Sequence, residues 1–355
     1  MEFCLDLSHL PWARDPDPRH AARLTIRTIE VADQAGLHSA WLSEDPDGWD
    51  AFTVLGAAAL RTERIRLGTG VTNPYLRHPV LLALSVATLD RLSGGRAFLG
   101  LGRGQPEWYR HGLGIATGRP LAALEETIML LRQWWEPPHC ASIDGHFHVH
   151  EWRLALAPVQ SAVPIYLAAI GPRALQLAAR LANGVLIADF ASEPFVRRLV
   201  PELLSQVQAA GRDATTFHVF VRTALTVTDD PEPILERRKN LFALLCTLPG
   251  MARQVEVPGF DVPALIARLR KVMRTQEVLA RGGGFALARD LGDLATARRL
   301  IPTELMAVLS YVGPASELRH RLRRLAESGV THVFLAPPAH PDPALYAELI
   351  AQVRP

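Results

Sequence analysis

Short apolar runs alternate with amphipathic stretches along the first 230 residues of the chain. The runs are bounded by Pro and Gly, a pattern typical of strands that are buried on both faces of a sheet. The stretches between them repeat apolar residues at helical spacing, as Ala22, Ile26, Ile29 and Ala32 do between residues 19 and 35. Seven strands are therefore predicted, over residues 3–7, 39–43, 65–71, 96–101, 165–170, 184–189 and 218–227.

The same alternation resumes close to the C-terminus. Gly313-Pro314 opens a predicted helix that Gly329 closes, an eighth apolar run covers residues 331–335, and a last helix covers 343–353. Eight strands that alternate with helices predict the α/β fold class and a parallel sheet closed as a (β/α)8 TIM barrel. A doubly wound open sheet is the alternative, but the regularity of the eight units favours closure.

Two segments interrupt the alternation. Residues 137–163 contain Asp144-Gly145 between strand-forming residues and predict a β-hairpin. Residues 228–305, between strands seven and eight, contain amphipathic stretches at 234–245 and 262–279, followed by three glycines that end at Gly284. A mostly helical insertion over the barrel mouth and a plain surface excursion are equally consistent with this pattern. We expect one domain over residues 1–355 that includes both insertions.

Composition narrows the classes of protein to which the chain can belong. Hydrophobic residues make up 48% of 355 positions, enough for a large core, and a net charge of +2 gives no broad basic surface for nucleic acid. Cys4, Cys140 and Cys246 are far apart and odd in number, so no disulfide framework is expected. The sequence shows no apolar run near the membrane-spanning length of about 18 residues and no basic-then-apolar leader. We expect a cytoplasmic protein without membrane or nucleic-acid partners.

The corner Gly171-Pro172-Arg173 has the features of an anion site. It follows the strand at 165–170 and opens a helix, where Pro172 suits the first turn because the N–H that it lacks is not needed there. Free backbone N–H groups, a helix N-terminus and the Arg173 guanidinium meet at this point. From these residues alone, an ordinary strand-to-helix turn is an equally good interpretation.

Two further segments, taken with this corner, resemble a known family. Residues 64–79 form a strand that runs into a Pro-flanked loop containing Gly70, and residues 94–108 form a strand followed by a glycine-rich loop containing Gln105. In this order and spacing, the three segments closely resemble the luciferase-like monooxygenase superfamily. They are most similar to its branch that uses coenzyme F420, a deazaflavin, and that includes methylenetetrahydromethanopterin reductase-like proteins.

The resemblance implies a cofactor that lies across the mouth of the barrel. Its phosphate would lie at the Gly171 corner, and its ring would rest against Gly70–Val71, a peptide bond that the F420 branch holds in the cis form. The implied cofactor-binding residues are Gly70, Val71, Asn73, Arg103, Gly104, Gln105, Ala169, Ile170, Gly171, Pro172 and Arg173. Coenzyme F420 is the expected cofactor, and FMN is the alternative on the same fold.

Three carboxylates at the ends of predicted strands are the candidate acids or bases: Asp6, Glu44 and Asp45. Asp189 ends a further strand and is expected to face the same mouth. The resemblance places Asp6 where the reductases carry a catalytic Glu; an ion pair with an Arg is the alternative interpretation. It places Glu44-Asp45 where many relatives carry Asp-His, whose His is catalytic in sugar-phosphate dehydrogenases. Those dehydrogenases also carry Glu where this chain has Gln105, so both departures argue against a glucose-6-phosphate dehydrogenase. Glu44 either hydrogen-bonds the cofactor ring or caps the next turn.

The remaining candidates concern the substrate and a metal. His9 and Trp108 are the predicted substrate contacts. His146, His148 and His150 would share one face of a strand, as zinc ligands can, but the predicted hairpin lies away from the mouth and no metal is expected. We predict an F420-dependent oxidoreductase that moves a hydride between the deazaflavin and a small organic substrate and acts as a homodimer. An FMN-dependent monooxygenase that uses oxygen, and a barrel that binds a flavin without catalysis, are the alternatives.

Overall fold

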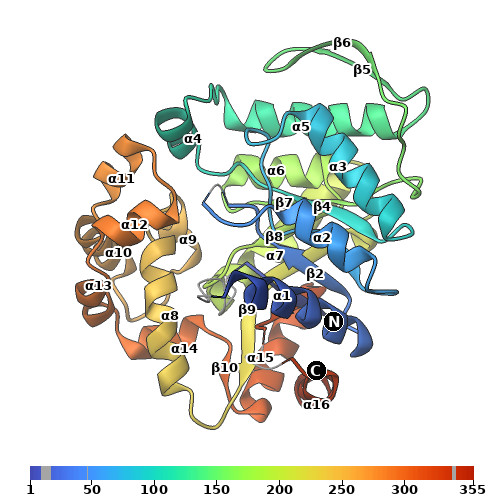
Figure 1. Ribbon diagram of the computed structural model, residues 1–355. Helices are drawn as coiled ribbons and strands as arrows, with labels where there is room; N and C mark the ends of the chain where they lie inside the picture. The colour runs from blue at the N-terminus through green and yellow to red at the C-terminus, as the bar shows by residue number, and fades with distance from the viewer. Residues whose placement is uncertain (9–16, 46, 338–340) are drawn as a thin grey trace.

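The computed structural model describes residues 1–8, 17–45, 47–337 and 341–355 and confirms the predicted barrel (Figure 1). The eight barrel strands are β1 (Glu2–Asp6), β2 (Ser39–Leu42), β3 (Arg66–Thr69), β4 (Ala97–Leu101), β7 (Ile165–Ala168), β8 (Gly184–Ile187), β9 (His218–Val227) and β11 (His332–Leu335). Each of them pairs with the next in this order, and β11 pairs back with β1, so the parallel sheet closes on itself and the open-sheet alternative is wrong.

Helices surround the barrel, as each βα unit requires (Figure 1). Several begin with a proline in the first turn after a side-chain cap; Ser192, for example, accepts a hydrogen bond from the Phe195 N–H at 3.3 Å. The outer helices are α1 (Pro18–Gln34), α2 (Ala51–Ala59), α3 (Pro79–Leu92), α5 (Pro120–Trp135), α6 (Pro172–Leu181), α7 (Glu193–Ala209), α15 (Ala315–Glu327) and α16 (Pro343–Val353). No helix among the described residues is long and apolar enough to cross a membrane.

Aromatic side chains fill the interior of the barrel. Trp41 is fully buried, and its ring centroid lies 4.4 Å from that of Phe98 and 4.7 Å from that of Phe220. Tyr166 and Phe334 complete the layer, with ring centroids 5.6 and 5.4 Å from Trp41. The barrel is therefore a packed core, and a ligand must bind at the ends of the strands rather than inside it.

The hairpin consists of β5 (Cys140–Asp144) and β6 (His148–Arg153), which pair antiparallel. His146 lies in the turn between these strands, so the expected single face of three histidines does not form. His148 instead pairs through Nδ1 with Asp144 Oδ1 at 2.7 Å. In the described part of the chain, no group of three or more His, Cys, Asp or Glu residues is placed to hold a metal ion.

Between β9 and α15 the chain forms a helical insertion at one side of the barrel (Figure 1). It is mostly helical, as predicted, but the expected helix over 262–279 is wrong because Arg274, at φ 48°, breaks it into α10 and α11. The insertion contains α8 (Glu232–Leu245), α9 (Met251–Gln254), α10 (Val262–Val272), α11 (Thr275–Arg281), α12 (Phe285–Leu291), α13 (Leu294–Leu300), α14 (Thr303–Leu309) and β10 (Val312–Gly313). Two further short helices, α4 (Pro106–Leu113) and η1 (Ala214–Thr216), were not predicted.

Candidate active site

The carboxyl ends of the barrel strands bring the predicted site residues to one rim, which we call the mouth. Asp6 ends β1, Gly70 directly follows β3, and Ala169 directly follows β7. All eight strands run parallel, so these ends face the same side of the barrel. His9, the predicted substrate contact, lies outside the described residues.

Asp6 is buried at the mouth and already has partners. Its Oδ1 accepts hydrogen bonds from the Ser8 backbone N–H at 2.9 Å and from the Ser8 hydroxyl. Its Oδ2 lies 3.5 Å from Arg222 Nε on β9. The structure thus contains the ion pair with an arginine that the sequence left open, and both carboxylate oxygens of Asp6 have a neighbouring donor.

Glu44, just after β2, is also buried and paired. Its Oε2 accepts a hydrogen bond from the Thr72 hydroxyl, and its Oε1 accepts one from Arg77 Nε at 2.9 Å. Both oxygens of Glu44 thus accept from side chains, and the cap of α2 is Asp50, which accepts from the Thr53 N–H at 2.8 Å. Glu44 instead joins the end of β2 to the loop that follows β3.

Asp45, the next residue, differs from its neighbour. No described residue donates a hydrogen bond to its carboxylate. Burial raises the pKa of Asp45 to about 6, and the charge of Asp47 adds to the rise, while Arg222 and Arg289 oppose it. Of the three candidate acids, Asp45 is thus the one without a hydrogen-bond donor in the described structure, and its pKa lies close to neutrality.

The backbone after β3 forms a tightly held corner. The Gly70–Val71 peptide bond is cis, as predicted. The Gly70 carbonyl accepts hydrogen bonds from the Ser43 hydroxyl at 2.7 Å and from Arg222 Nη2 at 2.8 Å. A Cβ atom at residue 70 would lie only 2.9 Å from the Cβ of Trp41, so glycine is needed for this close approach.

Polar residues of the loops after β3 and β4 hold each other. Asn73 is buried; its Oδ1 accepts a backbone N–H two residues on at 3.0 Å, and its Nδ2 donates to the Tyr109 hydroxyl at 3.1 Å. Arg103 Nη2 donates to Gln105 Oε1 at 3.3 Å. Gly104 has φ 58°, and a Cβ there would meet the Tyr109 hydroxyl at 2.4 Å. The loops are therefore set by their own contacts before any ligand binds.

The corner at the start of α6 is open by contrast. Gly171, Pro172 and Arg173 are all exposed, and no side chain caps the helix. A Cβ at Gly171 would meet nothing within 4 Å, and Arg173 forms no hydrogen bond or ion pair with a described residue. The backbone N–H groups of the first turn and a free guanidinium thus face solvent together, as an anion site requires.

Comparison with known proteins agrees with this geometry. Residues 1–332 match the model of the family described as luciferase-like monooxygenase. The chain belongs to this family. It is 28% identical over 327 residues to the 5,10-methylenetetrahydromethanopterin reductase of Archaeoglobus fulgidus, covering 91% of this chain and 92% of the reductase. It is 30% identical over 276 residues to an F420-dependent glucose-6-phosphate dehydrogenase of Beutenbergia cavernae, covering 74% and 79% of the two chains.

Among solved structures, the coenzyme F420 dependent tetrahydromethanopterin reductase from Methanopyrus kandleri superposes with a TM-score of 0.77 at 26% identity. The match covers 100% of this luciferase-like chain and 99% of the reductase. As a member of the family, the chain is an enzyme, an oxidoreductase. Its α6 corner fits the phosphate of a flavin or deazaflavin cofactor, because it combines unpaired backbone donors, an unpaired cation and open space.

The insertion contacts the mouth of this luciferase-like barrel at the loops that follow β2 and β4. Trp108, predicted in a loop but found in α4, packs edge-on against Phe285 of α12 with ring centroids 5.0 Å apart. The Ala286 N–H donates to the carboxylate of Asp47, close to Asp45 in the loop after β2. The Trp108 indole N–H is buried and has no hydrogen-bond partner among the described residues. Trp108 is therefore placed beneath the insertion, with a polar atom left for another partner.

A second contact fastens the insertion to the end of β8. Arg238 of α8 donates two hydrogen bonds to the Asp189 carboxylate, at 2.8 and 3.0 Å, and one to the Ser310 hydroxyl at 3.0 Å. Burial raises the pKa of Asp189, and the Arg238 charge opposes that rise. Asp189, a strand-end residue on sequence grounds, thus holds the insertion in place and is not free for a ligand.

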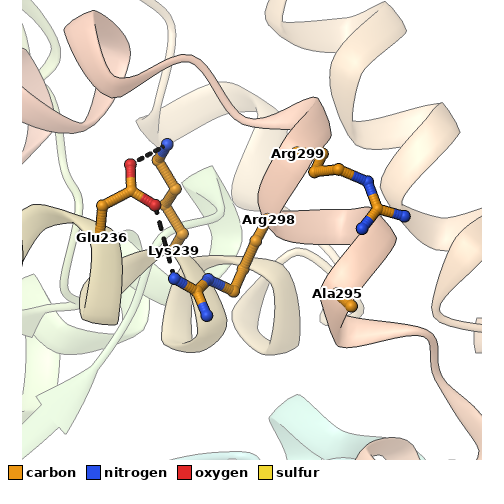
Figure 2. A pocket seen from close by; sticks show the side chains of 5 residues that line it. All are labelled: Glu236, Lys239, Ala295, Arg298 and Arg299. Carbon is orange, nitrogen blue, oxygen red and sulfur yellow. Dashed lines mark ion pairs between the residues drawn. The ribbon is translucent and has the colours of Figure 1, made fainter.

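A pocket of about 410 Å³ lies within the insertion rather than at the mouth (Figure 2). Glu236 of α8 lines the pocket; it pairs with Lys239, and its Oε2 lies 3.6 Å from Arg298 Nη2 on α13. Lys239 Nζ also donates to the Thr303 hydroxyl at 2.8 Å. These partners join α8, α13 and α14, so the polar lining of the pocket is accounted for by the packing of the insertion.

Arg222 and Phe285 are two of the contacts at the mouth that the sequence did not identify. The sequence does contain a signal for Arg222, because a charged residue inside the largely apolar run 218–227 needs a buried partner. Phe285 had none, because it opens a seven-residue helix whose position depends on how the insertion folds back.

Proposed function

We propose that the chain is a coenzyme F420-dependent oxidoreductase that transfers a hydride between the deazaflavin and a small organic substrate. The observation that carries the proposal is the mouth itself, where an open anion corner at α6 shares one rim with the unpaired carboxyl of Asp45. Relatives named as F420-dependent enzymes support the choice of cofactor. The family also includes monooxygenases, so FMN with oxygen is the competing function.

In the proposed complex, Arg173 and the first-turn N–H groups of α6 bind the cofactor phosphate, with Ala169 and Ile170 beside it. The ring rests on Gly70–Val71, and the loops after β3 and β4 line its edges through Asn73, Arg103, Gly104 and Gln105. When bound, the deazaflavin supplies a carbon that accepts or gives a hydride. The protein orients this carbon and keeps water away from it.

Asp45 holds the proton that accompanies hydride transfer in this proposal. A pKa of about 6 lets its carboxyl exchange a proton near neutral pH. Asp6 and Glu44 are committed to Arg222 and Arg77 and serve to shape the mouth. Trp108 forms a wall of the substrate side, with its indole N–H available to an acceptor on the substrate.

The test is a pair of anaerobic titrations, with coenzyme F420 and with FMN, followed by absorbance. We expect saturable binding of F420 that is at least about tenfold tighter than binding of FMN. Tight binding of FMN together with oxygen consumption by the reduced complex would establish the monooxygenase instead. Failure to bind either cofactor would overturn the proposal.

A further inference from the structure

Arg222 reaches several strand ends at the mouth, and the function proposed above uses it only as the partner of Asp6. It is on β9, and only 11% of its side chain is exposed. Its Nη2 donates to the Gly70 carbonyl at 2.8 Å, and its Nε lies 3.5 Å from Asp6 Oδ2. Its guanidinium carbon lies 5.5 Å from the ring centroid of Phe334. One side chain therefore connects β9 with β1, β3 and β11.

The contacts of Arg222 stabilise the fold less than full pairing of its guanidinium would. Removing a guanidinium from water is costly unless its N–H groups and its charge are fully paired. Arg222 Nε is buried and makes no hydrogen bond with a described residue, because its geometry with Asp6 does not meet the requirements of one. A buried arginine with an unused donor indicates that its position serves something other than the core.

The contact with Gly70 indicates what that is. The Gly70 carbonyl is held from two sides, by Arg222 and by the Ser43 hydroxyl. A Cβ at residue 70 would approach Arg222 Nη2 to 3.2 Å, so backbone and guanidinium fit closely. The Gly70 corner, on which the cofactor ring is proposed to rest, is thus held in position by Arg222 as well as by its own loop.

Arg222 also acts on the acids of the mouth through its charge. It pairs with Asp6 and opposes the rise in pKa that burial causes at Asp45 and Asp189. The other charged groups that act on Asp45 are Asp47, Arg289 and Glu44. Arg222 lowers the pKa of Asp45 more than Arg289 does, so removal of Arg222 leaves the Asp45 charge less compensated.

We propose that Arg222 is a positioning residue that fixes the Gly70 corner and the Asp6 carboxylate for the bound cofactor. The inference rests on the proposed function, because the ring is assigned to the Gly70 corner there. It predicts that Arg222 acts on cofactor binding without needing to touch the cofactor.

The test compares two variants. Arg222→Met keeps most of the length of the side chain and removes its charge, whereas Arg222→Lys keeps the charge and removes the planar guanidinium with its several N–H donors. Arg321→Met is the matched control. Arg321 is a buried arginine of α15 that donates to the Ser310 and Val308 carbonyls, each at 2.7 Å, and not to Gly70 or Asp6. Folding of each variant is checked by circular dichroism and melting, and affinity for F420 is measured by fluorescence titration.

We expect Arg222→Met to weaken F420 binding at least about tenfold and to shift the absorbance maximum of the bound cofactor, with Arg222→Lys intermediate. Arg321→Met should lower the melting temperature and leave affinity within about twofold. If wild type binds F420 and both Arg222 variants bind it equally well with the same spectrum, the inference is overturned while the proposed function stands. If wild type binds neither cofactor, the proposed function fails first. Should Arg222→Met not fold, Arg222→Lys decides alone, since normal affinity and spectrum there would contradict the inference.

Discussion

The two sides of the barrel mouth are built in opposite ways. At the start of α6, Gly171 and Arg173 are exposed and no side chain caps the helix. On the side of β2 and β4, Glu44 and Trp108 are buried, and α12 lies against this side. The open side keeps hydrogen-bond donors free for an anion that arrives from solvent. The covered side can exclude water from the cofactor and the substrate. Burial there can also raise the pKa of a carboxyl towards neutral pH.

Two adjacent residues show the same contrast within the covered side. Glu44 is tied to Thr72 and Arg77, whereas Asp45 accepts no hydrogen bond from a described residue. Similar side chains at neighbouring positions therefore have different uses. Its hydrogen bonds make Glu44 a structural residue of the mouth. The lack of such bonds leaves Asp45 free to carry a proton.

The largest effect is expected for Asp45→Asn. If Asp45 donates or accepts the proton of the reaction, its amide replacement should lower turnover about 10²–10⁴-fold, because a positioned acid or base contributes that much. Affinity for F420 should change little, since Asp45 is not assigned to the cofactor. Steady-state rates with any substrate that wild type converts provide the measurement. Turnover unchanged from wild type would remove Asp45 from the mechanism.

Glu44→Gln should affect stability rather than chemistry. Loss of a charged hydrogen-bond partner costs about 1.5–3 kcal/mol, and Arg77 would be left with Asp50 alone. We expect a melting temperature lower by a few degrees, with turnover per folded molecule within severalfold of wild type. A large fall in turnover without loss of stability would contradict the assignment of Glu44 to structure and of Asp45 to proton transfer.

The fold was predictable because each βα unit has its own boundaries. The turn Gly94-Gly95 has positive φ at both residues, and prolines at residues 79 and 120 mark the starts of α3 and α5. The insertion was less predictable, because its short helices give little periodicity and depend on packing with each other.

The site was only partly predictable for a related reason. Strand ends identified Asp6, Glu44 and Asp45, but the sequence could not distinguish them. Their difference depends on Arg222 and Arg77, which approach from other elements of the barrel. Pairing across a closed sheet is a tertiary property, and it decided which acid stayed free.

Arg173→Ala tests the open side. A charge-assisted contact with a phosphate contributes about 1.5–3 kcal/mol, so affinity for F420 should fall about tenfold or more. The melting temperature without cofactor should stay the same, because Arg173 is exposed and has no described partner. Arg180→Ala is a suitable control, since Arg180 lies at the other end of α6 and pairs with Glu125. Equal affinity in Arg173→Ala and wild type would argue against the phosphate corner.

The smallest expected effect is on stability as a function of pH. The pKa of Asp45 is raised by folding from 3.8 to about 6, so this group favours the folded state when protonated and loses that contribution as pH rises through 6. Asp45→Asn stays neutral, and it should therefore melt slightly higher than wild type at pH 7.5, with the gain shrinking towards pH 4.5. Melting curves of both proteins at the two pH values measure the difference. A gain that grows as pH falls would have the wrong sign.

The pKa of Asp45 most directly tests the central claim, which is that pairing fixes Asp6 and Glu44 whereas Asp45 is free to exchange a proton. Carbon-detected NMR of protein labelled at aspartate carboxyl carbons reports each side chain as pH changes, and comparison with Asp45→Asn assigns the signal. We predict that the Asp45 signal titrates near pH 6, well above an ordinary aspartate. An Asp45 signal that titrates near its ordinary value of 3.8 would contradict the proposed role of this residue as the proton carrier.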